Sequence, residues 1–168
     1  METVVHPIPP EYDADSRILI LGSFPSVKSR ESMFFYGHPQ NRFWKTLSAV
    51  FDDGLPSTVE EKKAFLHRHH IALWDVIASC EITGSSDSSI RNAVPNDIGS
   101  ILRSCHIEEI YVNGKTAARF YDRYLYPSVG RRAVCLPSTS PANAGCSLRK
   151  LTDEWRVIRT ESAGSYVK

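Results

Sequence analysis

The chain has 168 residues, a length that fits a single domain over 1–168 and that buries about 70% of its unfolded surface without cross-links. Its formal net charge of +1 excludes a strongly basic nucleic-acid-binding protein, but not local clusters of cations beside a phosphate-binding face. No 18-residue apolar run, signal-like start or basic presequence is present, so we expect a soluble cytoplasmic protein without a membrane partner, associated with the nucleoid in a prokaryote.

The first elements are an arm, a strand and a helix. Residues 1–16 contain three prolines before Glu11 and are expected to be an irregular arm. The first strand is predicted over 17–21, because the continuous apolar run at 18–21 is typical of a parallel strand buried on both faces. A long loop follows, and Asn41 is expected to cap the next helix, which ends by Gly54.

The rest of the chain alternates between helices and strands. A capping box at Ser57 or Thr58 predicts a second helix that ends near His69. The Ser-rich segment 79–95 is expected to be a surface loop, and Asn96 to cap a short helix. The later strands are predicted over 71–77, 107–112 and 132–136, and the later helices over 115–126 and 147–158.

Four strands that alternate with helices predict an α/β fold, a three-layer domain with a central four-stranded parallel sheet flanked by helices. Ligands in such sheets bind beyond the carboxyl ends of the strands, where the strand order reverses. The loops after the first and fourth strands both lie at these ends. They are therefore the candidate sites.

These two loops carry motifs that resemble a known family. GSFPS at 22–26 and YGHPQNRFW at 36–44 are similar to the first motif region of the uracil-DNA glycosylase superfamily, and LPSTSPANA at 136–144 resembles its second, DNA-inserting motif. With LWDVI at 73–77 and GSSDSSI at 84–90 between them, the chain is most similar to the hypoxanthine-DNA glycosylase (DNA-deoxyinosine glycosylase) branch. The resemblance covers nearly the whole chain.

The resemblance implies a uracil-DNA glycosylase-like fold and a monofunctional glycosylase of base excision repair. Such an enzyme flips a deaminated base, here hypoxanthine, out of the duplex and hydrolyses its N-glycosidic bond, which leaves an abasic site. The expected partner is double-stranded DNA that contains a deaminated base, and the protein is expected to be a monomer. No cofactor and no metal are implied. The four cysteines have no close pair, which argues against an iron-sulfur cluster, and they are expected to be free, buried thiols.

The catalyst is where the chain departs from the superfamily pattern. Most relatives place an Asn or Asp where Phe24 stands, and a phenyl ring cannot orient water. The resemblance implies that Asn41 takes over by binding the water, and the alternative is that Asn41 only caps a helix, worth about 1 kcal/mol. Leu136 stands where a His or Asn usually bonds the base, which argues against strong uracil excision.

The substrate-binding residues are expected around the first motif and at the second strand. Tyr36 aligns with the aromatic residue on which relatives stack the flipped base, a contact worth about 1–3 kcal/mol. Asp75, an isolated acid in an apolar strand, is expected to accept the N1 hydrogen of hypoxanthine. The segment 86–88 either helps it or forms a turn. The other candidates shape the pocket floor or flank the aromatic loop: Gly22, Ser23, Phe24, Pro25 and His38.

The DNA-binding residues are expected mainly in the second motif, which presses into the minor groove as wedges do. Cations beside both motifs, among them Arg30, Arg42, Lys45, Arg149 and Lys150, favour a phosphate-binding face, although each alone fits an ordinary solvated charge. The predicted DNA-binding residues are Pro137, Ser138, Thr139, Ser140, Pro141, Lys28 and Lys115.

Three alternatives remain open. The same fold can act on uracil, on mismatched bases or on xanthine. Phe24 and Leu136 also fit a non-catalytic module that binds damaged DNA. The third alternative, a mononucleotide-binding domain, is disfavoured because the chain contains no glycine-rich phosphate-binding loop. A metal site at the histidines 67, 69 and 70 is disfavoured as well, because no Cys or carboxylate lies at ligand spacing from them.

Overall fold

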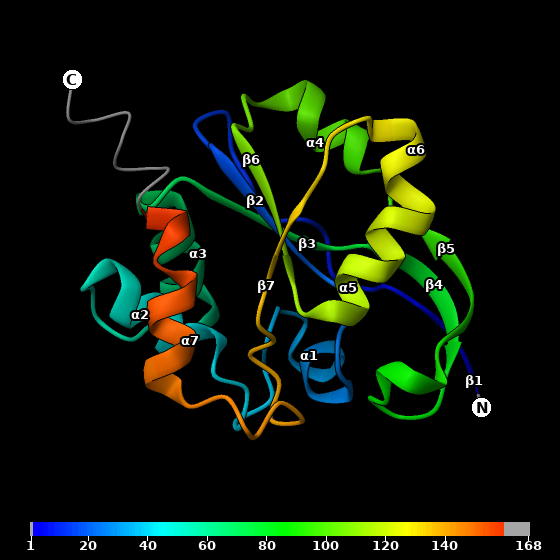
Figure 1. Ribbon diagram of the computed structural model, residues 1–168, viewed down its shortest axis with the longest axis horizontal. Coiled ribbons are helices and arrows are strands. Elements are labelled where there is room, and N and C mark those ends of the chain that lie inside the picture. Colours follow the sequence, from blue (N-terminus) through cyan, green and yellow to red (C-terminus); the bar gives the residue numbers. More distant parts are fainter. Residues whose placement is uncertain (1, 160–168) are drawn as a thin grey trace.

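The computed structural model describes residues 2–159, and a four-stranded parallel sheet forms its centre. All five residues of β2, an inner strand of the sheet, are buried, which is why its sequence is a continuous apolar run. The predicted class, a parallel four-stranded sheet flanked by helices, is confirmed (Figure 1). In spatial order the strands are β3 (Ile71–Asp75), β2 (Ile18–Gly22), β6 (Glu109–Asn113) and β7 (Val134–Leu136).

Helices cover both faces of this sheet in three layers (Figure 1). Alternate residues of β2 divide between two hydrophobic cores, with Ile18 and Ile20 on one face and Leu19 and Leu21 on the other. The first core contains α2 (Phe43–Phe51), α3 (Val59–Arg68) and α7 (Leu148–Trp155). The second contains α4 (Ile98–Ser104) and α5 (Lys115–Phe120), which continues through the π-helical segment η2 (Tyr121–Leu125) into α6 (Tyr126–Val129).

One of the three predicted helix caps is present, because Thr58 caps α3 in a full capping box. Arg42 and not Asn41 is the N-cap residue of α2, and Asn41 Oδ1 accepts the N–H of Phe43 at 2.9 Å from one position before the cap. The cap predicted at Asn96 is wrong. Its side-chain amide instead donates to the carbonyl oxygens of Asp75 and Ile77, at 2.9 and 3.2 Å. The chain leaves the parallel sheet between these two residues, so their carbonyls need a donor from elsewhere.

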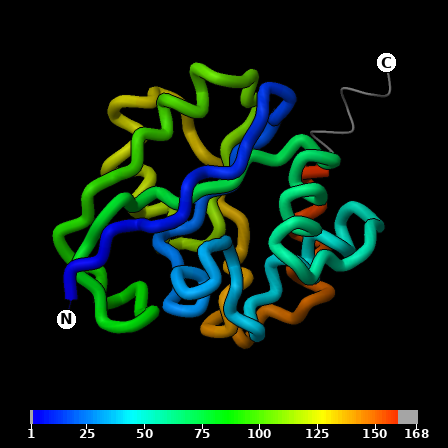
Figure 2. The backbone as a smooth tube through the Cα atoms, turned by 180° about the vertical axis from the view of Figure 1, so that it is seen from behind, coloured from blue at the N-terminus to red at the C-terminus, as the bar shows by residue number. Residues whose placement is uncertain are grey.

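A second, antiparallel sheet is absent from the sequence-based prediction. It consists of β1 (Glu2–Val5), β4 (Ile77–Ile82) and β5 (Arg91–Pro95), in the order β1-β4-β5, and Figure 2 shows the N-terminal strand running beside β4. The predictions of an irregular arm over 1–16 and of a surface loop over 79–95 are therefore wrong where these strands form. Both outer strands are short and mostly exposed, so neither carries an apolar period.

The chain passes from one sheet to the other beside the turn that follows β2. The predicted strand over 71–77 is divided at Val76, whose N–H donates to the carbonyl of Gly22 at 2.8 Å. The next N–H, of Ile77, donates to the carbonyl of Ser23 at 3.1 Å. The turn itself leads into α1 (Val27–Ser32), which Ser26 caps. These bonds fix Asp75 at the carboxyl end of β3, against the end of β2.

Two further sequence-based expectations concern thiols and membranes. Cys80 and Cys146 are buried and all four cysteines are free, whereas Cys135 is exposed, so the expected burial of every thiol is wrong. Within residues 2–159, no helix combines the length and the apolar character that crossing a bilayer requires.

Candidate active site

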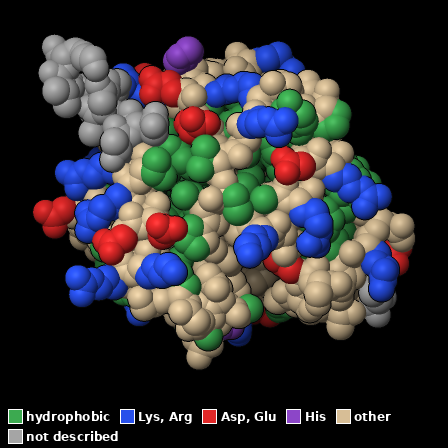
Figure 3. All heavy atoms as spheres, in the orientation of Figure 1, with side chains coloured by type: hydrophobic (Ala, Val, Ile, Leu, Met, Phe, Trp, Pro, Cys, Tyr) green, Lys and Arg blue, Asp and Glu red, His purple; other side chains and the backbone are tan. Residues whose placement is uncertain are grey.

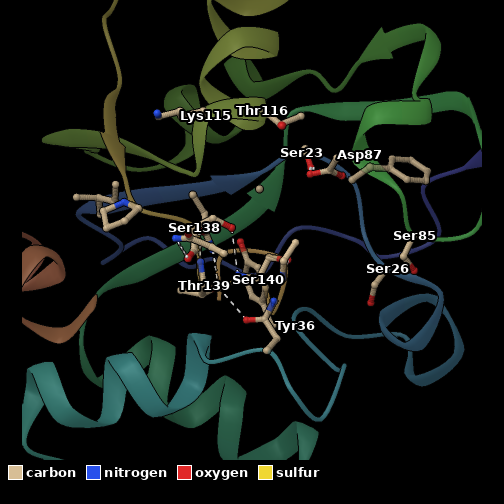
Figure 4. Close-up of a pocket in the computed structure, with 18 of the residues that line it drawn as sticks. Ser23, Ser26, Tyr36, Ser85, Asp87, Lys115, Thr116, Ser138, Thr139 and Ser140 are labelled. Carbon is tan, nitrogen blue, oxygen red and sulfur yellow. Dashed lines mark hydrogen bonds between the residues drawn. The ribbon is translucent and has the colours of Figure 1, made fainter. Parts of the chain in front are cut away.

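A pocket of about 910 Å³ lies at the carboxyl ends of the parallel strands. The strand order reverses at β2, with β3 on one side and β6 on the other, and a ligand site is expected at this switch point. Segments after all four strands line the pocket. In the view of Figure 4, Lys115 and Thr116 lie at the upper end of the pocket and Tyr36 at the lower end.

The structure brings most of the predicted site residues together in this pocket. Lys28, His38 and Pro141 are not among the lining residues. Lys28 is exposed and pairs with Glu31 at 3.6 Å, and Nδ1 of His38 accepts the N–H of Gln40 at 3.1 Å. The predicted residues that do line the pocket are Gly22, Ser23, Phe24, Pro25, Tyr36, Asn41, Asp75, Lys115, Pro137, Ser138, Thr139 and Ser140.

Asp75 holds a buried carboxylate at the pocket floor. Its side chain is 5% exposed, and Oδ2 lies 2.7 Å from Nε2 of His6, whose side chain is 2% exposed. The N–H of Ile8 donates to Nδ1 of His6 at 3.2 Å, so Nε2 carries the proton that His6 donates to Asp75. The second oxygen, Oδ1, faces Gly22, where an added Cβ would come within 2.4 Å of it. Glycine at this position therefore leaves space for the carboxylate.

Tyr36 lies against the same floor with an unsatisfied hydroxyl. Its φ of +54° is uncommon for an aromatic residue, and its ring stacks on Phe43 with 4.0 Å between ring centroids. The buried hydroxyl has no hydrogen-bond partner in the part of the chain that the structure describes. Burial raises the pKa of Tyr36, as does the charge of Asp75, so the hydroxyl keeps its proton at neutral pH. It is a donor without an acceptor.

A second carboxylate, that of Asp87 in η1 (Asp87–Ser89), also lines the pocket. Ser23 donates to both of its oxygens, at 3.0 and 3.1 Å, and Figure 4 shows the two side chains facing one another. Burial raises the pKa of Asp87, and the charge of Asp75 raises it further, against the hydrogen bond from Ser23 that lowers it. Asp87 therefore forms the turn and also reaches the pocket.

Asn41 is held by a chain of amide and hydroxyl contacts. Thr139 Oγ1 donates to Asn41 Oδ1 at 2.8 Å and accepts from Asn113 Nδ2 at 3.0 Å. The N–H of Thr139 donates to Asn113 Oδ1, also at 3.0 Å. Because Oδ1 of Asn41 also accepts the N–H of Phe43, both of its lone pairs are used. The Nδ2 group of Asn41, a lining residue, is left to meet a ligand.

Arg42 ties the second motif to the first. Its guanidinium donates to the carbonyl oxygens of Asn143 and Ser140, at 3.0 and 3.3 Å, and also to that of Cys146. Three converging carbonyls bind the guanidinium, so Arg42 holds the second motif in place, and its position on a phosphate-binding face stays a prediction. On the face drawn in Figure 3, Lys and Arg side chains are dispersed among Asp and Glu side chains and form no continuous patch.

His6 and Asn113 are the site residues that the sequence reasoning missed. Asn113 had a usable signal, because it is the first polar residue after an apolar strand and precedes a glycine turn. His6 had none. It reaches Asp75, 69 residues away, only because β1 pairs with β4, and neither strand was predicted.

Comparisons with known proteins agree with this geometry. A family model described as "Uracil DNA glycosylase superfamily" matches residues 9–160. A protein named hypoxanthine DNA glycosylase from Methanosarcina acetivorans is 32% identical over 152 residues, which cover 89% of this chain and 94% of the relative. A protein of the same name from Methanosarcina barkeri is 31% identical over 150 residues, or 88% and 92% of the two chains.

A solved structure is similar over the same range. It is a solution NMR structure from Methanosarcina acetivorans whose description contains the words uracil DNA glycosylase. The TM-score is 0.75 at 30% sequence identity, and the match covers 90% of this chain and 96% of the other. The fold is thus shared along nearly the entire chain.

Proposed function

Because the chain belongs to the uracil DNA glycosylase superfamily, we propose that it is a monofunctional DNA glycosylase that releases hypoxanthine from deoxyinosine in double-stranded DNA. Water attacks C1′ as the bond from C1′ to N9 breaks, and one proton of the water passes to the released base. The product is an abasic site. The names of the two relatives support this base, and one feature of the pocket floor carries the proposal.

That feature is the Oδ1 atom of Asp75, an acceptor that faces the pocket while Oδ2 is bonded to His6. An ionised carboxylate can only accept hydrogen bonds. Hypoxanthine carries a hydrogen on N1, whereas N1 of adenine carries a lone pair. The carboxylate therefore attracts the deaminated base and repels the normal base from which it arises.

Tyr36 supplies two further contacts. Phe43 covers one face of its ring, so a flipped base stacks against the other face. The protonated hydroxyl, close to Gly22 on the pocket floor, is a donor for a carbonyl oxygen of a bound base. A carbonyl next to an N–H is the edge that distinguishes hypoxanthine from adenine. Asp75 and Tyr36 together match this edge.

Asn41 is the proposed catalyst, and its hydrogen bonds decide which atom of its amide meets the substrate. Oδ1 is occupied by Phe43 and Thr139, so the amide meets the reacting groups through Nδ2. An N–H donor can hold the oxygen of the water, and it stabilises negative charge that develops on the departing base. The network from Asn113 through Thr139 fixes this donor before the substrate arrives.

The remaining contacts concern DNA. Ser138 and Ser140 are proposed to contact the backbone beside the flipped nucleotide, with Lys115 at the pocket rim as a cation for phosphate. Duplex DNA as the substrate form, a monomeric state and a location at the nucleoid remain predictions, as do the roles of Lys28, His38 and Pro141.

The test is single-turnover incubation of labelled duplexes that contain one hypoxanthine, one uracil or only normal bases, followed by alkali. Wild type is expected to produce alkali-labile sites at hypoxanthine and none at adenine. Asp75→Asn is expected to slow this by about 10- to 100-fold, because a hydrogen bond to a charged group is worth about 1.5–3 kcal/mol. Asp53→Asn, at a solvent-accessible ion pair with Arg68, is the matched control and keeps the wild-type rate.

The other outcomes separate the alternatives. Uracil also presents an N–H beside a carbonyl, so cleavage at uracil as fast as at hypoxanthine would move the assignment to uracil. Tight binding of damaged duplex without any alkali-labile site would instead support the non-catalytic binding module.

A further inference from the structure

We infer that His6, on the N-terminal segment, is a positioning residue of this active site that acts through Asp75. It donates its Nε2 proton to Oδ2 and so leaves Oδ1 as the carboxylate oxygen that meets the base. The inference rests on the proposed function and deepens it, since it names the residue that keeps the base-reading carboxylate in place. His6 itself does not line the pocket.

Backbone, hydrogen-bond and ring contacts hold His6 in place. Its backbone N–H donates to the carbonyl of Ala78 at 2.7 Å, and Nδ1 of its imidazole accepts the N–H of Ile8. The ring lies edge-on to Phe24 and Trp74, with centroid distances of 5.8 and 6.3 Å. Rotation of the ring would break the bond with Ile8 and disturb this packing. One tautomer and one orientation are therefore selected.

A carboxylate as buried as that of Asp75 needs such a donor. An ionised group moved out of water without a partner costs several kcal/mol. The groups that face it offer no charge balance, since Tyr36 carries an unbonded hydroxyl and Asp87 is a second acid. In residues 2–159, His6 is the side chain that donates to this carboxylate.

The arrangement makes the N-terminal strand part of the active site. β1 pairs with β4, the indole N–H of Trp74 donates to the carbonyl of Ile8 at 3.1 Å, and His6 lies between these two anchors. Loss of the imidazole frees the carboxylate to turn, so that Oδ1 no longer meets the base. The preference for a base with an N–H therefore depends on His6 as well as on Asp75.

The test compares three variants in single-turnover release of hypoxanthine. His6→Phe keeps a ring but removes the donor, and is expected to slow release by about 10- to 100-fold. His6→Gln returns an N–H donor, because its amide nitrogen is as many bonds from Cα as Nε2 of histidine, and most of the rate is expected to return. His67→Phe is the control. It breaks a similar pair, 2.6 Å from His67 Nε2 to Glu11, away from the pocket, and keeps the wild-type rate.

Two results would overturn the inference: a His6→Phe variant as fast as wild type, or a His6→Gln variant no faster than His6→Phe. The second result would reduce His6 to a packing residue. Wild type that releases no hypoxanthine would instead reject the proposed function. In that case a long-range proton–nitrogen NMR spectrum of the free protein decides: a proton on Nε2 and none on Nδ1 supports the positioning contact, and a proton on Nδ1 refutes it.

Discussion

The two walls of the pocket contain similar polar side chains in opposite hydrogen-bonding states. In the bonded wall, formed by Asn41, Asn113 and the loop 137–147 that Arg42 binds, side chains bond one another or the backbone across 26 to 101 residues of sequence. In the open wall, formed by Gly22, Tyr36, Asp75 and Asp87, the Tyr36 hydroxyl has no hydrogen-bond partner within residues 2–159, and the Asp75 carboxylate bonds His6 through Oδ2. One wall supports the site, and the other meets the ligand.

The difference follows from the cost of leaving buried polar groups unpaired. More than about 90% of such groups in proteins are bonded, so the bonded wall is ordinary and the open wall is the exception. An unpaired donor beside an unpaired acceptor is expected where a ligand with the opposite pair binds. Asn41 belongs to both walls in this respect, because its oxygen is bonded and its nitrogen faces the pocket.

The largest expected effect comes from removing that nitrogen. Asn41→Asp keeps the two accepted hydrogen bonds, from Phe43 and Thr139, but has no N–H, so single-turnover release of hypoxanthine should fall by about 10²- to 10³-fold. The melting temperature should stay close to that of wild type. An active Asn41→Asp enzyme would contradict the donor role, because it would mean that an oxygen at this position serves the water.

A smaller effect on stability should come from the bonded wall. Arg42→Ala leaves the carbonyl oxygens that Arg42 binds in the loop 137–147 without their donor, which should cost about 1–3 kcal/mol of unfolding free energy. Thermal unfolding and limited proteolysis of the loop measure this. Lys45→Ala, which removes an exposed cation on the same helix α2, is the matched control. Equal stability of the two variants would show that Arg42 does not stabilise the loop 137–147.

The next effect concerns the open wall. Tyr36→Phe keeps the ring and removes only the hydroxyl, so the rate of hypoxanthine release should fall by about 2- to 10-fold, the value of one neutral hydrogen bond. The protein itself should not be destabilised, since the hydroxyl is unpaired in the free protein. An unchanged rate would leave Tyr36 as a stacking surface alone.

The smallest effect is the pH dependence of stability at Asp87. Burial raises the pKa of Asp87 above that of the unfolded chain, so between the two values the folded protein binds more protons, and its stability falls as pH rises. Asp87→Asn removes this loss while keeping an acceptor for Ser23. The melting temperature of the variant relative to wild type should therefore increase from about pH 4 toward neutral pH.

Asp97→Asn, at an exposed acid that pairs with Arg103, is the control for this pH series. A difference in melting temperature between Asp87→Asn and wild type that stays constant with pH would show that the charge of Asp87 does not destabilise the folded protein.

The sequence identified the parallel sheet and the pocket loops because their signals are local. The apolar run at 18–21 and the capping box at Thr58 each lie within a few residues, and the structure follows them. The bonded wall depends on contacts such as that between Asn41 and Thr139, 98 residues apart, which no local pattern encodes. For the same reason the sequence did not predict the bonds of Arg42 to the loop 137–147 or the contact of His6 with Asp75.

The measurement that tests the account most directly is a reaction in water enriched with ¹⁸O, on a duplex that contains one deoxyinosine. The account predicts that free hypoxanthine is released without ¹⁸O and that the abasic sugar carries the label. Label at a phosphate beside a strand break, or no free hypoxanthine with wild-type protein, would contradict a glycosylase.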